Sequence, residues 1–530
     1  MNAAGLACVN ITLRFISVSF NAYISEKIGA ESMGLFTLVM SVYGLAVIIA
    51  CSGVNLASVR LSSEKSAILE KKFAAKKEYK KCASSVIRSC IFYSLIFSLS
   101  TSCVLFAFST LIGERILGDP RCVTSLRIVA VSLPAISATS ALSGYFTGLR
   151  KAYKNAFSVI VEQFLKISVT SFALSLALPG GTDPVEYACV AVVGGSAFAE
   201  ACSLLVNSIL YFSDSKISSG IKPGKNKSTE CDAIRANLKE VASISLPTAI
   251  GSYARSGLVT AEHLLIPGGL RKSGLNASDA LSAYGIVQGM VFPLILFPSA
   301  LPASFSALLI PEISGLHATG NVDKIKQAAN ISLSVSLFFS VGVAAVFLNF
   351  ANYLGMNLYA QKEAVTGIYI MAPLVPVMYL DSTVDALLKG LGAQLDSMKI
   401  NIIDALSSLI LVFFLVPVFG IYGYLITVYL CEILNFLLSF TRLIRISGFR
   451  PSILSSLSRA AASAIFCSVL FFVFNKMPFY ESIPIPFLIT AFSALYIIVL
   501  SILPGGNNSR LRSYLRRVKI NSGLRKRGTL

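Results

Sequence analysis

The sequence predicts an all-α polytopic membrane protein with about 14 transmembrane helices in two related halves. Three observations lead to this prediction. Hydrophobic residues make up 55% of the 530 residues and charged residues only 13%, about half the charged fraction of an ordinary soluble protein. Apolar runs of about 20 residues, enough to cross a bilayer, recur along the whole chain. Similar residues also return at an offset of 241 or 242 positions, which indicates an internal repeat.

Each predicted helix is one of these apolar runs. The first run is not expected to be a cleavable signal peptide, since it lacks a basic N-terminal region and carries Arg14 at its centre. In chain order the predicted spans are 5–24, 33–59, 86–112, 123–147, 157–179, 185–212, 241–266, 279–308, 330–352, 364–388, 400–417, 421–441, 455–475 and 484–503.

The basic residues predict the orientation of these helices. If the N-terminus is cytoplasmic, 32 of the 45 Lys and Arg residues lie in cytoplasmic segments and only 7 in outer ones. Loops rich in Lys and Arg stay on the cytoplasmic side of a membrane. We therefore expect a plasma-membrane protein with both termini in the cytoplasm. The seven outer residues are Lys27, Arg115, Arg121, Arg271, Lys272, Lys362 and Lys476.

The net charge of +19 is explained by this cytoplasmic surface and does not require nucleic acid as a partner. The segments "KKFAAKKEYKK" (71–81) and "RLRSYLRRVKI" (510–520) are expected to lie against anionic membrane lipids. Most of the eleven cysteines fall inside predicted helices, so no disulfide framework is predicted. His263 and His317 are too far apart in sequence to suggest a metal site. No cofactor is expected.

The internal repeat predicts the domain organisation. It aligns Arg14 with Arg255, "SVYG" (41–44) with "SAYG" (282–285), Pro134 with Pro376, Ser140 with Ser382, Gly148-Leu149 with Gly390-Leu391, and Glu162 with Asp404. Six helices separate the copies, and this even number gives both halves the same orientation, about an axis along the membrane normal. The predicted domains are an N-lobe (1–212), a cytoplasmic linker (213–240), a C-lobe (241–452), helices 13 and 14 (453–504) and a basic cytoplasmic tail (505–530).

Each half carries an arginine near the middle of its first helix. A charge at this depth costs at least about 2.5–3.5 kcal/mol, so it should face a water-filled cavity or a buried partner such as Glu262 for Arg255. Guanidinium groups bind phosphate in a bidentate manner, so two arginines in one cavity would suit an anionic ligand. The candidate substrate-binding residues are Asn10, Arg14, Ser17 and Asn21 on one face of the first helix, and Ser252, Arg255 and Glu262 on the seventh.

Acidic residues inside the tenth helix are candidates for ion coupling. Asp381, Asp385 and Lys389 share one helix face, and Asp385 and Lys389 have the favourable order for an ion pair. The alternatives are a structural pair and a site for a coupling cation or proton. Glu162 and Lys166 in the fifth helix are also four residues apart and are expected to form a local salt bridge.

Several stretches resemble a known family. They are "IGAESMGLFTLVMSVYGL" (28–45), "SALSGYFTGLRKAYKNAFSVIVEQ" (140–163), "SISLPTAIGSYARSGLVTAEHLLIPGGLRKSGL" (243–275), "YGIVQGMVFPLILFPSALPASFSALLIPEIS" (284–314) and "LLKGLGAQLDSMKINIIDA" (387–405). In order and spacing they are similar to the oligosaccharide-flippase branch of the multidrug/oligosaccharidyl-lipid/polysaccharide exporter superfamily, most of all to the stage V sporulation protein B group. The resemblance implies two six-helix lobes around a central cavity plus two extra helices. It also implies alternating access, a lipid-linked sugar diphosphate as substrate, and contact of Arg14 and Arg255 with the diphosphate.

The predicted function is export of an undecaprenyl-linked oligosaccharide or peptidoglycan precursor from the cytoplasmic to the outer leaflet, without catalysis. "GIKPGKNKST" (220–229) lacks the spacing of a phosphate-binding loop, so ion gradients, membrane potential or product consumption would drive transport. One alternative is a drug/cation antiporter of the same superfamily, which would need acids at the cavity centre. A polyprenyl-dependent glycosyltransferase is a second, but the outer loops are short and no Asp-x-Asp occurs. A membrane scaffold would leave the repeated arginines unexplained.

Overall fold

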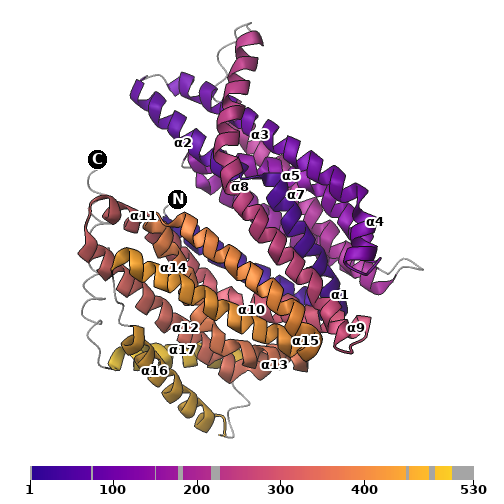
Figure 1. The fold of residues 1–530 in the computed structure, drawn as a ribbon, viewed down its shortest axis with the longest axis vertical. Helices are drawn as coiled ribbons and strands as arrows, with labels where there is room; N and C mark the ends of the chain where they lie inside the picture. The colour runs from indigo at the N-terminus through magenta and orange to yellow at the C-terminus, as the bar shows by residue number, and fades with distance from the viewer. Residues whose placement is uncertain are drawn as a thin grey trace. The chain divides into compact units, whose positions relative to one another are not determined.

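A computed structural model describes residues 3–72, 76–149, 151–176, 183–216, 227–448, 453–476 and 484–503. These residues form helices and no strands (Figure 1). Eleven of the helices are long and apolar enough to cross a membrane. The predicted all-α polytopic fold is confirmed. The basic segment 510–520, the tail 505–530 and the centre of the predicted linker (217–226) lie outside the described residues, as do the side chains of 71–81.

The helices follow the chain in this order: α1 (Ala3–Cys51), α2 (Val54–Lys72), α3 (Lys76–Ala107), α4 (Ser109–Leu111), the π-helix η1 (Ile112–Ile116), α5 (Cys122–Gly148), α6 (Ala152–Ser175), α7 (Pro184–Lys216), α8 (Lys227–Lys272), α9 (Ala277–Tyr284), the π-helix η2 (Gly285–Val291), α10 (Phe292–Leu296), the 3₁₀ helix η3 (Phe297–Ser299), α11 (Ala300–Ala318), α12 (Val322–Tyr359), α13 (Lys362–Met371), the 3₁₀ helix η4 (Ala372–Leu374), α14 (Val375–Gly390), α15 (Gln394–Ser447), α16 (Ile453–Phe474) and α17 (Ile485–Ile502).

Two of the described helices, α1 and α15, each cover two predicted spans. α1 has 49 residues and α15 has 54, whereas a bilayer needs about 20. Each is broken at one glycine with non-helical backbone angles, Gly29 (φ 77°, ψ 172°) in α1 and Gly420 (φ 60°, ψ −138°) in α15. A positive φ is readily adopted only by glycine. The breaks fall between predicted spans one and two and between spans eleven and twelve.

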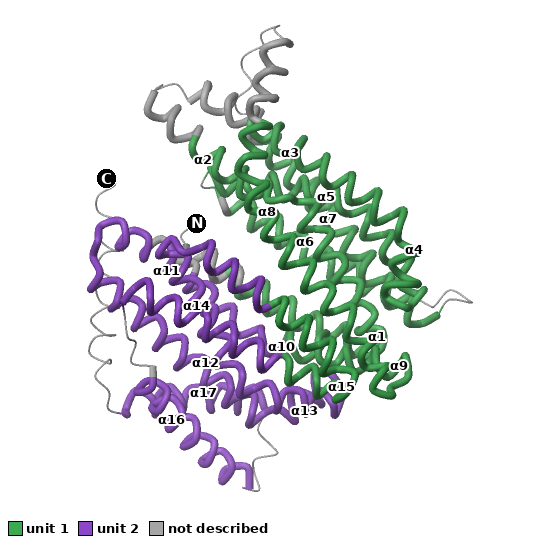
Figure 2. The backbone as a smooth tube through the Cα atoms, in the orientation of Figure 1, with its two compact units in different colours: residues 1–293, 405–427 green, residues 294–404, 428–530 purple. Residues whose placement is uncertain are grey.

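The chain divides into two compact units, coloured separately in Figure 2. Unit 1 comprises residues 1–293 and 405–427, and unit 2 comprises residues 294–404 and 428–530. Unit 1 therefore contains α8, α9 and η2 in addition to the six helices that the repeat assigns to the first half. The domain boundaries drawn from the repeat remain a prediction.

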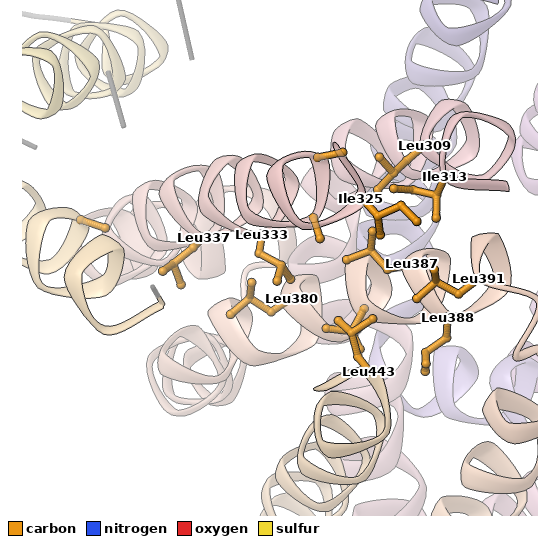
Figure 3. Packing of buried hydrophobic residues seen from close by; sticks show 14 of the residues in the cluster. Leu309, Ile313, Ile325, Leu333, Leu337, Leu380, Leu387, Leu388, Leu391 and Leu443 are labelled. Atoms are coloured by element: carbon orange, nitrogen blue, oxygen red, sulfur yellow. The ribbon is translucent and has the colours of Figure 1, made fainter. Parts of the chain in front are cut away.

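Each unit has a hydrophobic core in which helices from different parts of the chain meet. The core of unit 1 joins α2, α3 and α5 and includes Val54, Leu61, Ile87, Leu142 and Phe146. The core of unit 2 joins α11, α12 and α14 to one residue each of α15 and α16; Figure 3 shows the leucines and isoleucines that fill it, such as Leu309, Ile325, Leu333, Leu387 and Leu443. Packing among helices, with lipid on the outside, holds such bundles together.

The two cores are built from the same positions of the repeat. At an offset of 242, Val86 and Ile87 correspond to Ala328 and Ala329, and Leu142, Tyr145 and Phe146 correspond to Val384, Leu387 and Leu388; all ten residues belong to one core or the other. The turns that follow also match, since Leu149 (φ −83°, ψ 9°) corresponds to Leu391 (φ −81°, ψ 3°). The sequence repeat is thus also a repeat of packing.

A pair of hydrogen bonds repeats in the same way. In unit 1, the Ser137 hydroxyl of α5 donates to the carbonyl of Ser94 in α3 at 3.1 Å. At the corresponding positions in unit 2, the Ser336 hydroxyl of α12 donates to the carbonyl of Tyr379 in α14 at 3.2 Å. At the offset of 242, Ser94 corresponds to Ser336 and Ser137 corresponds to Tyr379. The same two positions are therefore joined in both copies, with donor and acceptor exchanged.

Candidate functional site

Unit 1 contains a cavity of about 250 Å³ that the first predicted helix helps to form. Two of the predicted site residues, Ser17 and Asn21, line it together with Gln163 and Lys166 of α6. The rest of the lining is apolar: Val18, Phe20, Ile24, Phe36, Val192 and Pro293. Ligand pockets combine a largely apolar wall with a few polar groups in this way, but they are usually larger, about 300–1,000 Å³. The cavity is thus a small one with four polar side chains in an otherwise apolar wall.

The residues predicted to form the polar face of the first helix have different environments in the structure. Arg14 and Ser17 are exposed, and Arg14 forms no ion pair with any residue that the structure describes. Asn21 instead donates a hydrogen bond of 2.7 Å to the carbonyl of Gly289 in η2. A π-helix changes the usual helical hydrogen bonding, and this amide supplies a donor there. The side chain of Asn10 lies outside the described part of the chain.

The predicted site residues of α8 do not form a cluster. Ser252 and Arg255 are exposed, whereas Glu262 is buried. The Ser252 hydroxyl donates to the carbonyl of Thr248 in its own helix at 3.1 Å. Among the described residues, Arg255 has no ion pair. The alternative of a buried pair between Arg255 and Glu262 is therefore not what this structure contains.

Unit 1 also contains a group of titratable side chains that sequence reasoning did not assign to the site. The Tyr43 hydroxyl of α1 donates a short hydrogen bond to Oε1 of Glu200 in α7. The other carboxylate oxygen, Oε2, is buried and has no hydrogen-bond partner among the described residues. Lys166 of α6 interacts electrostatically with both Glu200 and Glu162. The sequence signal for this group was Glu200, an acidic residue in the middle of the run "AFAEACS" (197–203).

The predicted salt bridge between Glu162 and Lys166 is absent. Both residues lie in α6, yet no described ion pair of 4.0 Å or less contains either of them. The prediction was wrong in its geometry because helical spacing brings two side chains near each other without fixing their rotamers. Lys166 instead lines the cavity.

The acids of α14 in unit 2 have separate partners. Asp385 accepts a hydrogen bond from the Lys389 ammonium at 2.5 Å and another, shorter one from the Ser397 hydroxyl. The i, i+4 ion pair expected from the sequence is thus present. Asp381, one turn earlier, accepts a hydrogen bond of 3.1 Å from the side-chain amide of Asn435. Asp385 is therefore ion-paired within its own helix, whereas the hydrogen bond of Asp381 reaches α15.

Arg121, expected in an outer segment, connects several helix ends of unit 1. Its guanidinium donates to both carboxylate oxygens of Asp119 and to Glu31 at 2.9 Å. The second oxygen of Glu31 accepts a hydrogen bond of 2.6 Å from Ser278 in α9. Asp183, just before α7, lies 3.7 Å from the same guanidinium. This network links α1 at Glu31 to α9 and to the residues just before α5 and α7.

The sequence matches a known family over more than half of its length. Residues 1–317 match the family described as "Polysaccharide biosynthesis protein". The chain belongs to the polysaccharide biosynthesis protein family. Residues 272–414 of this family member also match the MatE family. Among curated proteins, it is 25% identical over 421 residues to stage V sporulation protein B of Bacillus subtilis, covering 79% of this chain and 78% of that protein.

Solved structures show the same fold. The structure titled "Lipid II flippase MurJ, inward closed conformation" matches with a TM-score of 0.67 at 15% sequence identity, over 97% of this chain and 99% of that one. An inward-facing multidrug resistance MATE family transporter of the MOP superfamily matches with a TM-score of 0.59 at 14% identity, over 83% and 99%. With its apolar helices, this polysaccharide biosynthesis protein is therefore a multi-pass membrane protein with the fold of these two structures, which are titled as a flippase and a transporter.

Proposed function

We propose that this protein moves an undecaprenyl-linked oligosaccharide or peptidoglycan precursor from the cytoplasmic to the outer leaflet of the plasma membrane by alternating access. Arg14 and Arg255, two arginines without ion pairs among the described residues, support this proposal more than any other feature. An intramembrane charge without an internal partner requires water or a ligand. A diphosphate supplies the complementary charge in a geometry that guanidinium groups bind well.

The cavity of unit 1 adds to this support. The charged, hydroxyl-rich headgroup of a lipid-linked sugar cannot cross hydrocarbon unaided, because each unsatisfied polar group costs several kcal/mol. Ser17, Gln163 and Lys166 offer hydrogen-bonding groups in place of water. The lipid tail needs no such help, since it stays in hydrocarbon throughout. We propose a cytoplasmic position for both termini because most Lys and Arg residues then lie in cytoplasmic segments.

Measuring the leaflet accessibility of a lipid-linked sugar in proteoliposomes would test the proposal. We expect purified protein to speed exchange of the lipid-linked sugar between leaflets relative to empty liposomes, and not to move a cationic dye. The match of residues 272–414 to the MatE family favours an antiporter as the second candidate function. Gradient-driven movement of the dye without lipid exchange would replace the flippase proposal with this second candidate.

Asp381 and Asp385 are the two residues proposed for ion coupling. Asp385 is already paired with Lys389, so a cation or proton that binds Asp385 would have to displace that pair. We expect Asp381→Asn to remove the dependence of exchange on a Na⁺ or proton gradient, and Asp385→Asn to retain it. The measurement is the ratio of exchange rates with and without an imposed gradient. Unchanged gradient dependence in both variants would show that neither residue couples transport.

A further inference from the structure

One membrane span of the structure changes its helical geometry repeatedly. The chain runs from α9 through the π-helix η2, the short helix α10 and the 3₁₀ helix η3 into α11. Pro293 is the second residue of α10. Prolines and π-helices are common causes of a kink inside a helix, and a 3₁₀ stretch in the middle of a helix often marks a hinge. This span therefore contains a candidate hinge at Pro293.

The segments on the two sides of Pro293 are anchored in different units. Before it, the Gln288 amide of η2 donates a short hydrogen bond to the Tyr424 hydroxyl, and both residues belong to unit 1. After it, the carbonyl of Ile295 accepts a hydrogen bond of 2.6 Å from the Tyr379 hydroxyl, and both residues belong to unit 2. The first stretch of unit 1 ends at Pro293 itself. A bend at Pro293 is therefore compatible with both of these contacts.

Pro293 also removes a hydrogen-bond donor from its own helix. In a regular α-helix the carbonyl of Gly289 would accept the N–H of residue 293, but proline has none. The side-chain amide of Asn21 in α1 donates to this same carbonyl at 2.7 Å. Buried backbone groups almost always have a partner, and Gly289 is buried. A side chain from another helix thus replaces the missing backbone donor. Asn21 and Pro293 both line the cavity of unit 1.

We propose that Gly289–Pro293 is a hinge in this membrane span, and that the Asn21 amide is the tether that holds the hinge in its present form. With the tether in place, the carbonyl of Gly289 has a donor and the turn before Pro293 is closed. Without the tether, that carbonyl loses its substitute donor and the span bends more easily. The inference rests on the proposed function in one respect, because it takes this bend as a step of alternating access.

Hydrogen–deuterium exchange of the full-length protein in detergent micelles would test the tether. Asn21→Leu keeps the size of the side chain but has no donor. We expect the backbone amides of 285–297 to exchange about 5–30-fold faster in this variant than in wild type, the effect of one unsatisfied buried carbonyl. Amides in the core of unit 1, around Ile87 and Phe146, should keep their wild-type rates. A loss of overall stability would instead speed both regions.

A variant of the proline makes this test specific. Pro293→Ala restores the backbone N–H, so adding it to Asn21→Leu should return the amides of 285–297 close to their wild-type rates. Asn55→Leu is the matched control. The Asn55 amide of α2 also donates to a carbonyl of another helix, that of Ser140 in α5 at 3.0 Å. Four residues after Ser140 stands Gly144, which has an N–H of its own, so loss of the Asn55 amide should leave the exchange of α5 unchanged.

Movement of a lipid-linked sugar between leaflets tests whether transport uses the hinge. The backbone hydrogen bond that Pro293→Ala restores must break when the span bends, so this variant should transport about 5–30-fold more slowly than wild type. Wild-type transport by Pro293→Ala would overturn the role of the bend.

The tether itself has two outcomes that would overturn it. One is unchanged amide exchange in Asn21→Leu, and the other is faster exchange that Pro293→Ala does not reverse. A wild type that moves no lipid-linked sugar would contradict the flippase proposal, whereas amide exchange would still decide the tether, since that measurement needs no substrate.

Discussion

Replacing Arg14 and Arg255 together by alanine is expected to slow exchange of a lipid-linked sugar at least about a hundredfold. Each bidentate contact between a guanidinium and a phosphate contributes about 1.5–3 kcal/mol, and about 1.4 kcal/mol corresponds to a factor of ten. Both side chains are exposed and without ion pairs in the part of the chain that the structure describes. Their removal should therefore affect the substrate more than the stability of the fold.

Two further variants make this experiment specific. The double lysine variant retains the charges but loses the fork-shaped donor groups, so we expect an intermediate exchange rate. Arg127→Ala is the matched control, since Arg127 is also an exposed arginine in a membrane helix but already has a partner, a hydrogen bond of 3.2 Å to Ser109. Normal exchange by the double alanine variant would exclude both arginines from the headgroup site.

Replacing Gly34 by alanine should destabilise the protein by about 2–4 kcal/mol, which lies at or above the usual cost of overpacking. A Cβ atom at Gly34 in α1 would lie 2.1 Å from the backbone oxygen of Leu281 in α9. Across the same contact, a Cβ atom at Gly285 would lie 2.3 Å from the backbone oxygen of Ala30. The clash is with backbone, so no side-chain rotation can relieve it. The two helices would have to separate.

Gly44 provides the control within the same helix. A Cβ atom there would meet no atom within 4 Å, and alanine is favoured over glycine inside a helix by about 0.5–1 kcal/mol. We therefore expect a lower thermal midpoint in detergent for Gly34→Ala and an equal or higher one for Gly44→Ala. Equal midpoints for the two variants would mean that the close approach of α1 and α9 is not needed for stability.

The sequence by itself determined the all-helical membrane fold, because the length of an apolar run reports directly on the thickness of the bilayer. It also determined the repeat, which the structure shows again in the matching core positions around Ile87 and Ala329. The ion pair between Asp385 and Lys389 could be predicted for a similar reason. Its two residues lie one helical turn apart, so the local geometry alone brings them together.

Only the tertiary structure decided which polar side chains share a site. Asn21 lines the cavity, but its amide also donates a hydrogen bond to the carbonyl of Gly289, which is 268 positions away in the chain. Tyr43 and Glu200, 157 positions apart, form a hydrogen bond that no sequence spacing could indicate. Periodicity reports the face of one helix, whereas the partner across that face depends on how separate helices pack.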